Sequence, residues 1–212
     1  MPPVDGADGT DDIAVTRAFG AAATLLALGG IAVAIVLDPT FSWTTDALSD
    51  LGVRDRSAPV FNWGLILGGI AGVGYAFGLW RSPAGAPIAA VRAAVLALAM
   101  VAMAGVGVFD LTEPLHGPAA IGFYTLITVA FAVDGLARRS TTTGRVALAF
   151  VPVHVAVWAT FVAGRWPVSG LALPELPGAL MLAAWVWVLG PLPVLGLVSD
   201  SIGTRPDGVD DA

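Results

Sequence analysis

The sequence predicts an all-α, polytopic membrane protein whose six transmembrane helices form one bundle. The 212 residues are 57% hydrophobic and only 12% charged, with a mean hydropathy of +0.83, whereas a soluble domain carries about 25% charged residues. The apolar residues fall into six separated runs, each close to the roughly 20 helical residues that cross a hydrocarbon core of about 30 Å. The predicted spans are residues 18–37, 59–80, 88–109, 118–137, 146–164 and 176–198.

Helices are expected because backbone groups in lipid must find their hydrogen-bond partners within the protein, which only helices and closed barrels achieve. The apolar runs are continuous rather than alternating, and this excludes a barrel. Six spans and their loops leave no room for a separate soluble domain. We therefore expect one transmembrane domain over residues 15–198, between an acidic disordered cytoplasmic tail at 1–14 and an acidic cytoplasmic tail at 199–212.

The first three runs each carry one informative feature. The first is expected to be retained as a helix, because its leader is acidic and its apolar stretch is longer than that of a signal peptide. The second contains Gly64, Gly68 and Gly72, and small residues four apart let helices approach closely in lipid. This pattern fits either a homo-oligomer contact or close packing inside the bundle. Arg92 lies a few residues into the third run and is expected to snorkel to the inner interface.

The fifth and sixth runs are interrupted by proline. Pro152 cannot donate to the carbonyl of Leu148, which predicts a local kink. His154 lies near the middle of the membrane, where an ionisable group is a functional candidate; the alternative is a neutral histidine bonded to the freed carbonyl. Pro191 and Pro193 are expected to bend or end the sixth helix.

The arginines predict the orientation of the chain, since cytoplasmic segments of membrane proteins are enriched in basic residues. With both termini in the cytoplasm, seven of the ten arginines fall in inner segments and three in outer ones. We therefore expect a multi-pass protein of the cell membrane whose loops at 38–58, 110–117 and 165–175 face outward. Most acids outside the tails lie in these loops. Asp134 is an exception, and its spacing from Arg138 predicts an ion pair along one helix.

Composition limits the cofactors and partners of the chain. The absence of cysteine excludes disulfides, thiolate metal sites and cysteine nucleophiles. No basic patch suggests nucleic acid, so membrane lipid is the expected partner. No haem or nucleotide site is evident, and His116 and His154 lie at different depths. All ten basic residues are arginine and the net charge is -6, a bias that resembles the proteins of halophilic archaea.

The first outer loop places three apolar side chains, Trp43, Leu48 and Leu51, among polar neighbours. This predicts a short amphipathic helix that lies on the outer surface or is tucked over the bundle. Within that segment, Ser49 and Asp50 either face a polar pocket together or cap a turn.

The third outer loop contains Asp110 and His116 at one face of the membrane. Such a pair could share a proton or a metal ion, or it could orient a tight loop. Pro118 suits the first turn of the fourth helix.

Four polar residues are therefore expected at one depth on the outer face: Ser49, Asp50, Asp110 and His116. They are the candidate catalytic residues of a site for a lipid head group, and Asp50, Asp110 and His116 are the candidate metal ligands. Glu175 of the fifth loop could join them. The alternatives are a non-enzymatic structural or accessory membrane protein and a transporter, although no three-helix repeat is present and only His154 lies deep.

The loop motifs resemble the domain-of-unknown-function 998 family. The matching segments are Ser-Asp-Leu-Gly at 49–52, the pair Phe109 and Asp110, and His116 at the start of the next span. The resemblance covers nearly the whole chain and implies a six-helix prokaryotic membrane protein without an assigned activity. The family pattern has a proline between the phenylalanine and the aspartate; this chain lacks it, which leaves the geometry of the third loop open.

Overall fold

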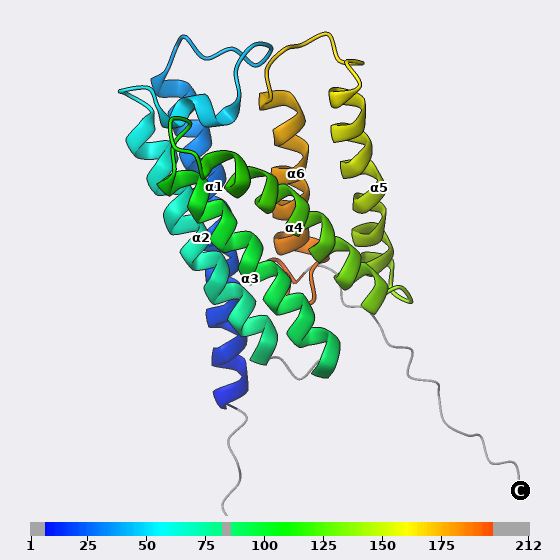
Figure 1. Ribbon diagram of the computed structural model, residues 1–212. Coiled ribbons are helices and arrows are strands. Elements are labelled where there is room, and N and C mark those ends of the chain that lie inside the picture. The colour runs from blue at the N-terminus through cyan, green and yellow to red at the C-terminus, as the bar shows by residue number, and fades with distance from the viewer. Residues whose placement is uncertain (1–6, 82–85, 197–212) are drawn as a thin grey trace, which may run out of the picture.

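The computed structural model describes residues 7–81 and 86–196, and within these ranges the chain contains helices and turns but no strand. Six of the helices are long and apolar enough to cross a membrane, which confirms the predicted fold class. They are α1 (Ala7–Leu37), α2 (Ala58–Arg81), α3 (Ala86–Val108), α4 (His116–Ala137), α5 (Thr142–Val162) and α6 (Ala172–Ala184), as Figure 1 shows. The sixth span continues beyond α6, through the π-helical turn that follows it, to Leu189.

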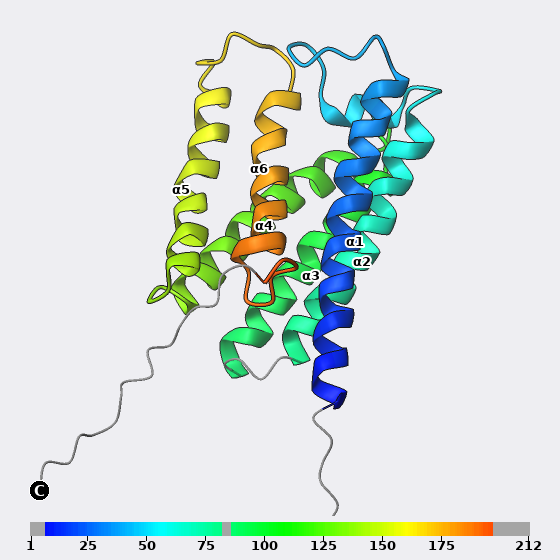
Figure 2. The ribbon, with the colours of Figure 1, turned by 180° about the vertical axis from the view of Figure 1, so that it is seen from behind.

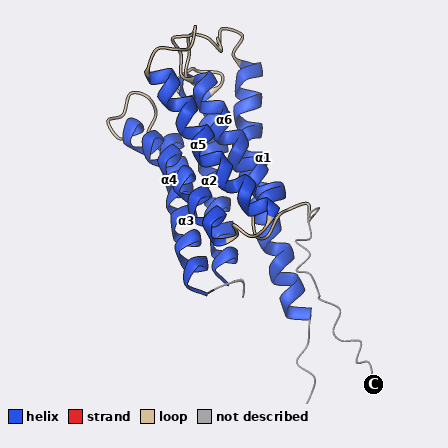
Figure 3. Cartoon of the chain, turned by 90° about the vertical axis from the view of Figure 1, so that its right-hand side faces the viewer, coloured by secondary structure: helices blue, strands red, loops and turns tan. Residues whose placement is uncertain are grey.

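The helices form one bundle in which α4 crosses the others obliquely. It runs from the end of the bundle where α2 begins to the foot of α5 (Figure 1), and α6 stands between α1 and α5 when seen from behind (Figure 2). We call the end that carries the loops at 38–57, 109–115 and 163–171 the loop end, and the opposite end the terminal end. Figure 3 shows loops, in tan, at the top and upper left of the bundle.

Helix α1 begins at Ala7, well before the apolar run that starts at residue 18. Residues 7–14, which were expected to belong to a disordered tail, are helical instead. Acidic residues in the first turns of a helix are stabilised by its macrodipole. Asp12 also accepts a hydrogen bond from Arg81 of α2 at 3.2 Å.

Helix α6 ends earlier than the predicted residue 198. Its last α-helical residue is Ala184, and a π-helical turn, η2, follows at Trp185–Leu189. The amide of Gly190 closes that turn on the carbonyl of Trp185 at 2.6 Å. The helix stops there because the residue before Pro191 is disfavoured in the α region. The second predicted tail, 199–212, lies outside the described residues.

Side-chain bonds join η2 and the residues after it to helices far away in the sequence. The Trp187 indole donates to the Thr24 hydroxyl of α1 at 2.7 Å. The Tyr75 hydroxyl of α2 donates to the carbonyl of Leu192, just beyond α6, at 3.1 Å. These bonds tie the last helix to the first two.

The glycines of α2 pack within the chain. A Cβ on Gly64 would lie 2.8 Å from the Leu26 carbonyl of α1, and one on Gly68 would be equally close to α1. Gly72 lies against the side chain of Met100 of α3. Close packing inside the bundle therefore accounts for these glycines, and a homo-oligomer through the same face stays a prediction.

A buried charge cluster links α3, α4 and η2 near the terminal end. Asp134 forms the predicted pair with Arg138, through its Nε at 2.9 Å and through Nη2. The same carboxylate accepts from Arg92 Nη1 at 3.2 Å and from the Trp185 indole at 2.7 Å. Arg92 is only 2% exposed, so the expectation that it snorkels to the interface was wrong. A buried carboxylate within reach of its guanidinium holds it inside instead.

Candidate functional site

The short helix predicted in the first outer loop forms as a 3-10 helix, η1, at Leu48–Gly52. Leu51 is fully buried and Leu48 is nearly so, whereas Trp43 remains partly exposed. The apolar residues of η1 therefore turn inward, and the segment is tucked over the bundle.

Ser49 and Asp50 of η1 have different roles. The Asp50 carboxylate accepts a hydrogen bond from the amide of Ala47 at 2.7 Å and so caps the 3-10 helix. Ser49 is buried, and the structure records no hydrogen bond at its hydroxyl within the described ranges. The capping role thus belongs to the aspartate, and the serine hydroxyl is free to contact a ligand.

Asp110 and His116 each bind their own loop rather than each other. The Asp110 carboxylate accepts from the hydroxyl of Thr112 at 2.6 Å and from its amide at 2.8 Å. These bonds hold the pKa of Asp110 below its usual range. The Nδ1 of His116 bonds the carbonyl of Phe109 at 2.7 Å. This arrangement matches the alternative in which the two residues orient a tight loop.

The bond to Phe109 fixes the tautomer of the His116 ring. Because a carbonyl can only accept, Nδ1 carries the hydrogen and donates it. In the neutral ring, Nε2 is then an acceptor, and it makes no recorded hydrogen bond in the described part of the chain. His116 therefore retains one unused acceptor in a buried position.

Glu175 joins the site from the first turn of α6. Its Oε2 accepts from the amide of Leu48 at 2.7 Å, across 127 residues of sequence. The side chain is buried, and its second oxygen makes no recorded hydrogen bond to a described residue. The glutamate thus fixes η1 to α6 and keeps one oxygen available.

Ser49, His116 and Glu175 line the same cavity in the bundle. Its wall comes from η1, α1, α2, α3, α4 and α6, and beyond these three residues it is largely apolar. Along α6 and into η2 it extends from Glu175 to Val186, roughly 16 Å at 1.5 Å per residue. The centre of a water-sized sphere can move through about 80 Å³ of it, so the cavity is long and narrow.

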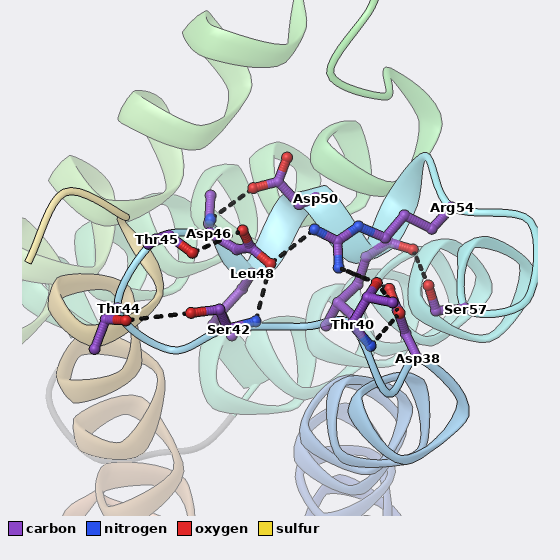
Figure 4. Close-up of polar contacts among 12 residues, drawn as sticks. Asp38, Thr40, Ser42, Thr44, Thr45, Asp46, Leu48, Asp50, Arg54 and Ser57 are labelled. Atoms are coloured by element: carbon purple, nitrogen blue, oxygen red, sulfur yellow. Dashed lines mark hydrogen bonds and ion pairs between the residues drawn. The ribbon is translucent and has the colours of Figure 1, made fainter.

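An arginine clamp holds the loop that leads into η1 (Figure 4). Arg54 donates to Asp38 at 2.8 Å and to Asp46 at 2.7 Å. The hydroxyl of Thr40 and the Arg54 guanidinium lower the pKa of Asp38 to about 2. The amide of Ser42 and Arg54 likewise lower the pKa of Asp46. Both carboxylates therefore remain charged partners of Arg54 at neutral pH.

The clamped loop also docks onto the segment before α6. The carbonyl of Thr44 accepts from the amides of Ser169 and Gly170, each at 3.0 Å, and the carbonyl of Asp46 accepts from Ala172 at 2.9 Å. Gly170 lies so close to the backbone of Asp46 that no Cβ fits there. The two loops thereby pack together at the loop end, next to η1 and the first turn of α6, and we call this pair of loops the cover.

Replacing Arg54 with glutamine is expected to loosen this cover at neutral pH, because two carboxylates lose their shared partner. In the wild type, acid should have the same effect. The pKa of Asp38 is depressed in the folded chain, so its contribution is complete above about pH 4 and is lost as the pH falls towards 2. Hydrogen exchange of residues 38–57 between pH 7 and pH 2.5 measures both effects.

The matched control for this test is Arg56→Gln, since Arg56 is exposed in the same loop. It should exchange like the wild type at every pH. Equal exchange in the Arg54 and Arg56 variants would show that the clamp does not hold the loop.

Both ring nitrogens of His154 have hydrogen-bond partners within the protein, and the residue does not line the cavity. Its Nε2 accepts from the Trp158 indole at 3.1 Å, so Nδ1 carries the hydrogen and donates to the hydroxyl of Thr128 at 2.7 Å. The ring is only 1% exposed. It is a neutral histidine, as the alternative reading expected, but side chains rather than a freed carbonyl satisfy it. Helix α5 runs through Pro152 without interruption.

The described residues contain no cluster of three or more potential metal ligands. Asp50 caps η1 and Asp110 holds its loop, so neither is brought to His116 as a ligand set. The polar end of the cavity combines Ser49 and His116 of the predicted set with Glu175. Sequence reasoning did not single out Arg54, although an arginine among the acids of an outer loop, against the general bias, was a usable signal.

Comparison with known proteins gives a family match. A family model described as "Protein of unknown function (DUF998)" matches residues 21–191, which reach from α1 to just beyond η2. No curated protein and no solved structure matches the chain.

Proposed function

The chain belongs to the DUF998 family of multi-pass membrane proteins, and from that premise we propose that it binds one amphiphile within the bundle. The apolar chain of the ligand occupies the cavity between the helices. Its head group lies at the loop end, against Ser49, His116 and Glu175.

The observation that carries this proposal is a single cavity with one polar end. Three buried polar side chains with unused hydrogen-bonding capacity meet at the loop end, and the rest of the wall is largely apolar. None of their three unpaired atoms is among the fully enclosed unpaired polar atoms of the described residues, so each is accessible, and a ligand head group would supply the partners that polar groups normally have. The cavity is narrow and extends roughly 16 Å along α6 and into η2, so it fits one extended hydrocarbon chain better than two.

The chemistry of the polar end favours a head group that donates hydrogen bonds. His116 Nε2 and the second oxygen of Glu175 are both acceptors, and the Ser49 hydroxyl can accept as well. The Asp50 carboxylate acts electrostatically on Glu175 at this end, so an anionic head group would be disfavoured there. A hydroxylated or amine-bearing head group fits, and a bare phosphate does not.

We propose a binding role rather than a catalytic or metal-dependent one. Asp50 and Asp110, the two carboxylates that could have served as bases or ligands, hold their own loops. A transporter is less well supported, because His154 is neutral and has its partners within the bundle. The arginine distribution supports cytoplasmic termini in the cell membrane, with the loop end outside. The absence of lysine supports an origin in a halophilic archaeon.

The test is to fill the cavity. Ala179 lines it one helical turn below Glu175, and Ala179→Phe would place a ring where the hydrocarbon chain passes. Native mass spectrometry of the protein in mild detergent should find one retained amphiphile in the wild type. Retention should be at least about tenfold weaker in the variant, equivalent to about 1.4 kcal/mol of binding free energy.

Ala32→Phe is the matched control, since Ala32 lies on the exposed face of α1. It should retain the amphiphile like the wild type, and both variants should unfold at nearly the wild-type temperature. Equal retention in all three proteins, or no retained amphiphile in any of them, would refute the proposal.

A further inference from the structure

Two arginines, Arg92 and Arg138, pair with Asp134 near the terminal end, far from the proposed head-group site. Arg17 of α1, Arg92 of α3 and Arg138, the residue that follows α4, act electrostatically on the hydroxyl of Tyr75, as does Asp134. Asp134 is the one acid among these four charged groups. The cluster therefore has an excess of positive charge in a buried setting, where charge is costly without a counterion.

Arg138 shows how a guanidinium is satisfied in this environment. Its Nε and Nη2 face the two oxygens of Asp134 as a parallel pair of donors. Nη1 donates to the hydroxyl of Thr143 at 2.8 Å, and Nη2 also reaches the carbonyl of Leu189 at 2.6 Å. Every nitrogen of this side chain has an acceptor, and the edge formed by Nε and Nη2 binds a carboxylate.

In Arg92, the corresponding edge formed by Nε and Nη2 has no acceptor among the described residues. Its Nη1 donates to Asp134 at 3.2 Å, but its Nε and Nη2 are buried and have no hydrogen-bond partner among the described residues. The Nε of Arg17 is likewise buried and has no hydrogen-bond partner among the described residues. Nε and Nη2 of an arginine point the same way and match two oxygens of one carboxylate or phosphate. Leaving such donors buried and unpaired is expensive.

We propose that Arg92 binds an oxyanion through its Nε and Nη2 edge, with Arg17 adding positive charge nearby. The ligand is a phosphate or carboxylate group, carried by an anionic lipid head group or present as a free anion. Water could accept the hydrogen bonds but could not balance the charge. Arg92 is six residues into α3, about 9 Å from the start of the helix at 1.5 Å per residue, a depth that a lipid phosphate can reach.

This site is separate from the proposed amphiphile site and has the opposite preference in charge. The head-group end of the cavity offers acceptors, whereas Arg92 offers donors and a positive charge. The Nε and Nη2 of Arg92 are buried, so binding of an anion requires neighbouring side chains at the terminal end to move. Each site can be tested without affecting the other.

The test compares thermal unfolding of the protein in phosphatidylcholine nanodiscs under two additions at constant ionic strength. One series replaces part of the lipid with phosphatidylglycerol, and the other adds inorganic phosphate. The wild type should be stabilised in at least one series. In Arg92→Gln the apparent affinity for the effective probe should fall about ten- to a hundredfold, as expected for a pair of charge-assisted hydrogen bonds.

Arg145→Gln is the matched control, because Arg145 is exposed at the same end of the bundle, and it should respond like the wild type. Arg92→Lys keeps the ion pair with Asp134 but not the two-donor edge, so its response should be intermediate; it serves if Arg92→Gln does not fold. A response to phosphatidylglycerol alone identifies a lipid, and a response to phosphate alone identifies a free anion. No response in the wild type, or equal responses in wild type and Arg92→Gln, would overturn the proposal.

Discussion

Asp134→Asn is expected to lower the free energy of unfolding by about 3–5 kcal/mol, the usual cost of removing one member of a buried ion pair. The side chain is fully buried, and its carboxylate receives hydrogen bonds from Arg92, Arg138 and the Trp185 indole. Asparagine keeps the shape of the side chain but removes the charge that both guanidinium groups face. The loss should therefore greatly exceed that of one neutral hydrogen bond.

Thermal unfolding followed by circular dichroism in detergent measures this effect. Asp12→Asn is the control, since Asp12 also pairs with an arginine but is 66% exposed. Exposed ion pairs contribute at most about 1 kcal/mol, so this variant should unfold close to the wild-type temperature. Similar losses in the two variants would mean that the buried cluster does not stabilise the bundle.

Gly170→Ala is expected to separate the two loops of the cover. The added methyl would overlap the backbone of Asp46 and Thr45, which cannot retreat as a flexible side chain could. The hydrogen bonds that the amides of Ser169 and Gly170 donate to the carbonyl of Thr44 would then be lost. Overpacking of this kind costs about 1–3 kcal/mol. Retention of the proposed amphiphile should fall as well, because the same docking holds η1 against Glu175.

Hydrogen exchange at residues 169–172 and native mass spectrometry together test this prediction. Gly29→Ala is the control, because a Cβ on Gly29 of α1 meets nothing within 4 Å. Alanine is favoured over glycine inside a helix by about 1 kcal/mol, so the control should be as stable as the wild type or more so. Slow exchange and full retention in Gly170→Ala would contradict the proposed cover.

The membrane fold was predictable because hydropathy alone identifies spans in lipid, and all six spans were found. Helix ends were less predictable, since apolar character does not determine where a helix stops. Polar residues extend α1 back to Ala7, and a π-helical turn followed by Pro191 ends α6 early. The side chain of Arg92 was misjudged because its partner, Asp134, lies 42 residues away in the sequence.

The candidate site was only partly predictable, because spacing in the sequence says little about which side chains share a cavity. Ser49 and His116 do meet in one wall. Their neighbours Asp50 and Asp110 satisfy local backbone groups instead, as short acidic side chains commonly do in turns. Glu175 meets η1 where the segment before α6 docks on the first outer loop. Backbone hydrogen bonds hold the two segments together, and a sequence pattern does not predict such bonds.

The long-range bonds of α6 have a consequence for how the protein is made. Helices α1 to α4 are all synthesised before the segment that contains Glu175, Ala179 and Val186, which forms one wall of the cavity. Until α6 and η2 emerge, the Thr24 hydroxyl and the amide of Leu48 lack the partners that Trp187 and Glu175 supply. We therefore expect the cavity of the nascent bundle to be open on the side that this segment later forms, so that a lipid can enter from the bilayer before the last helix packs.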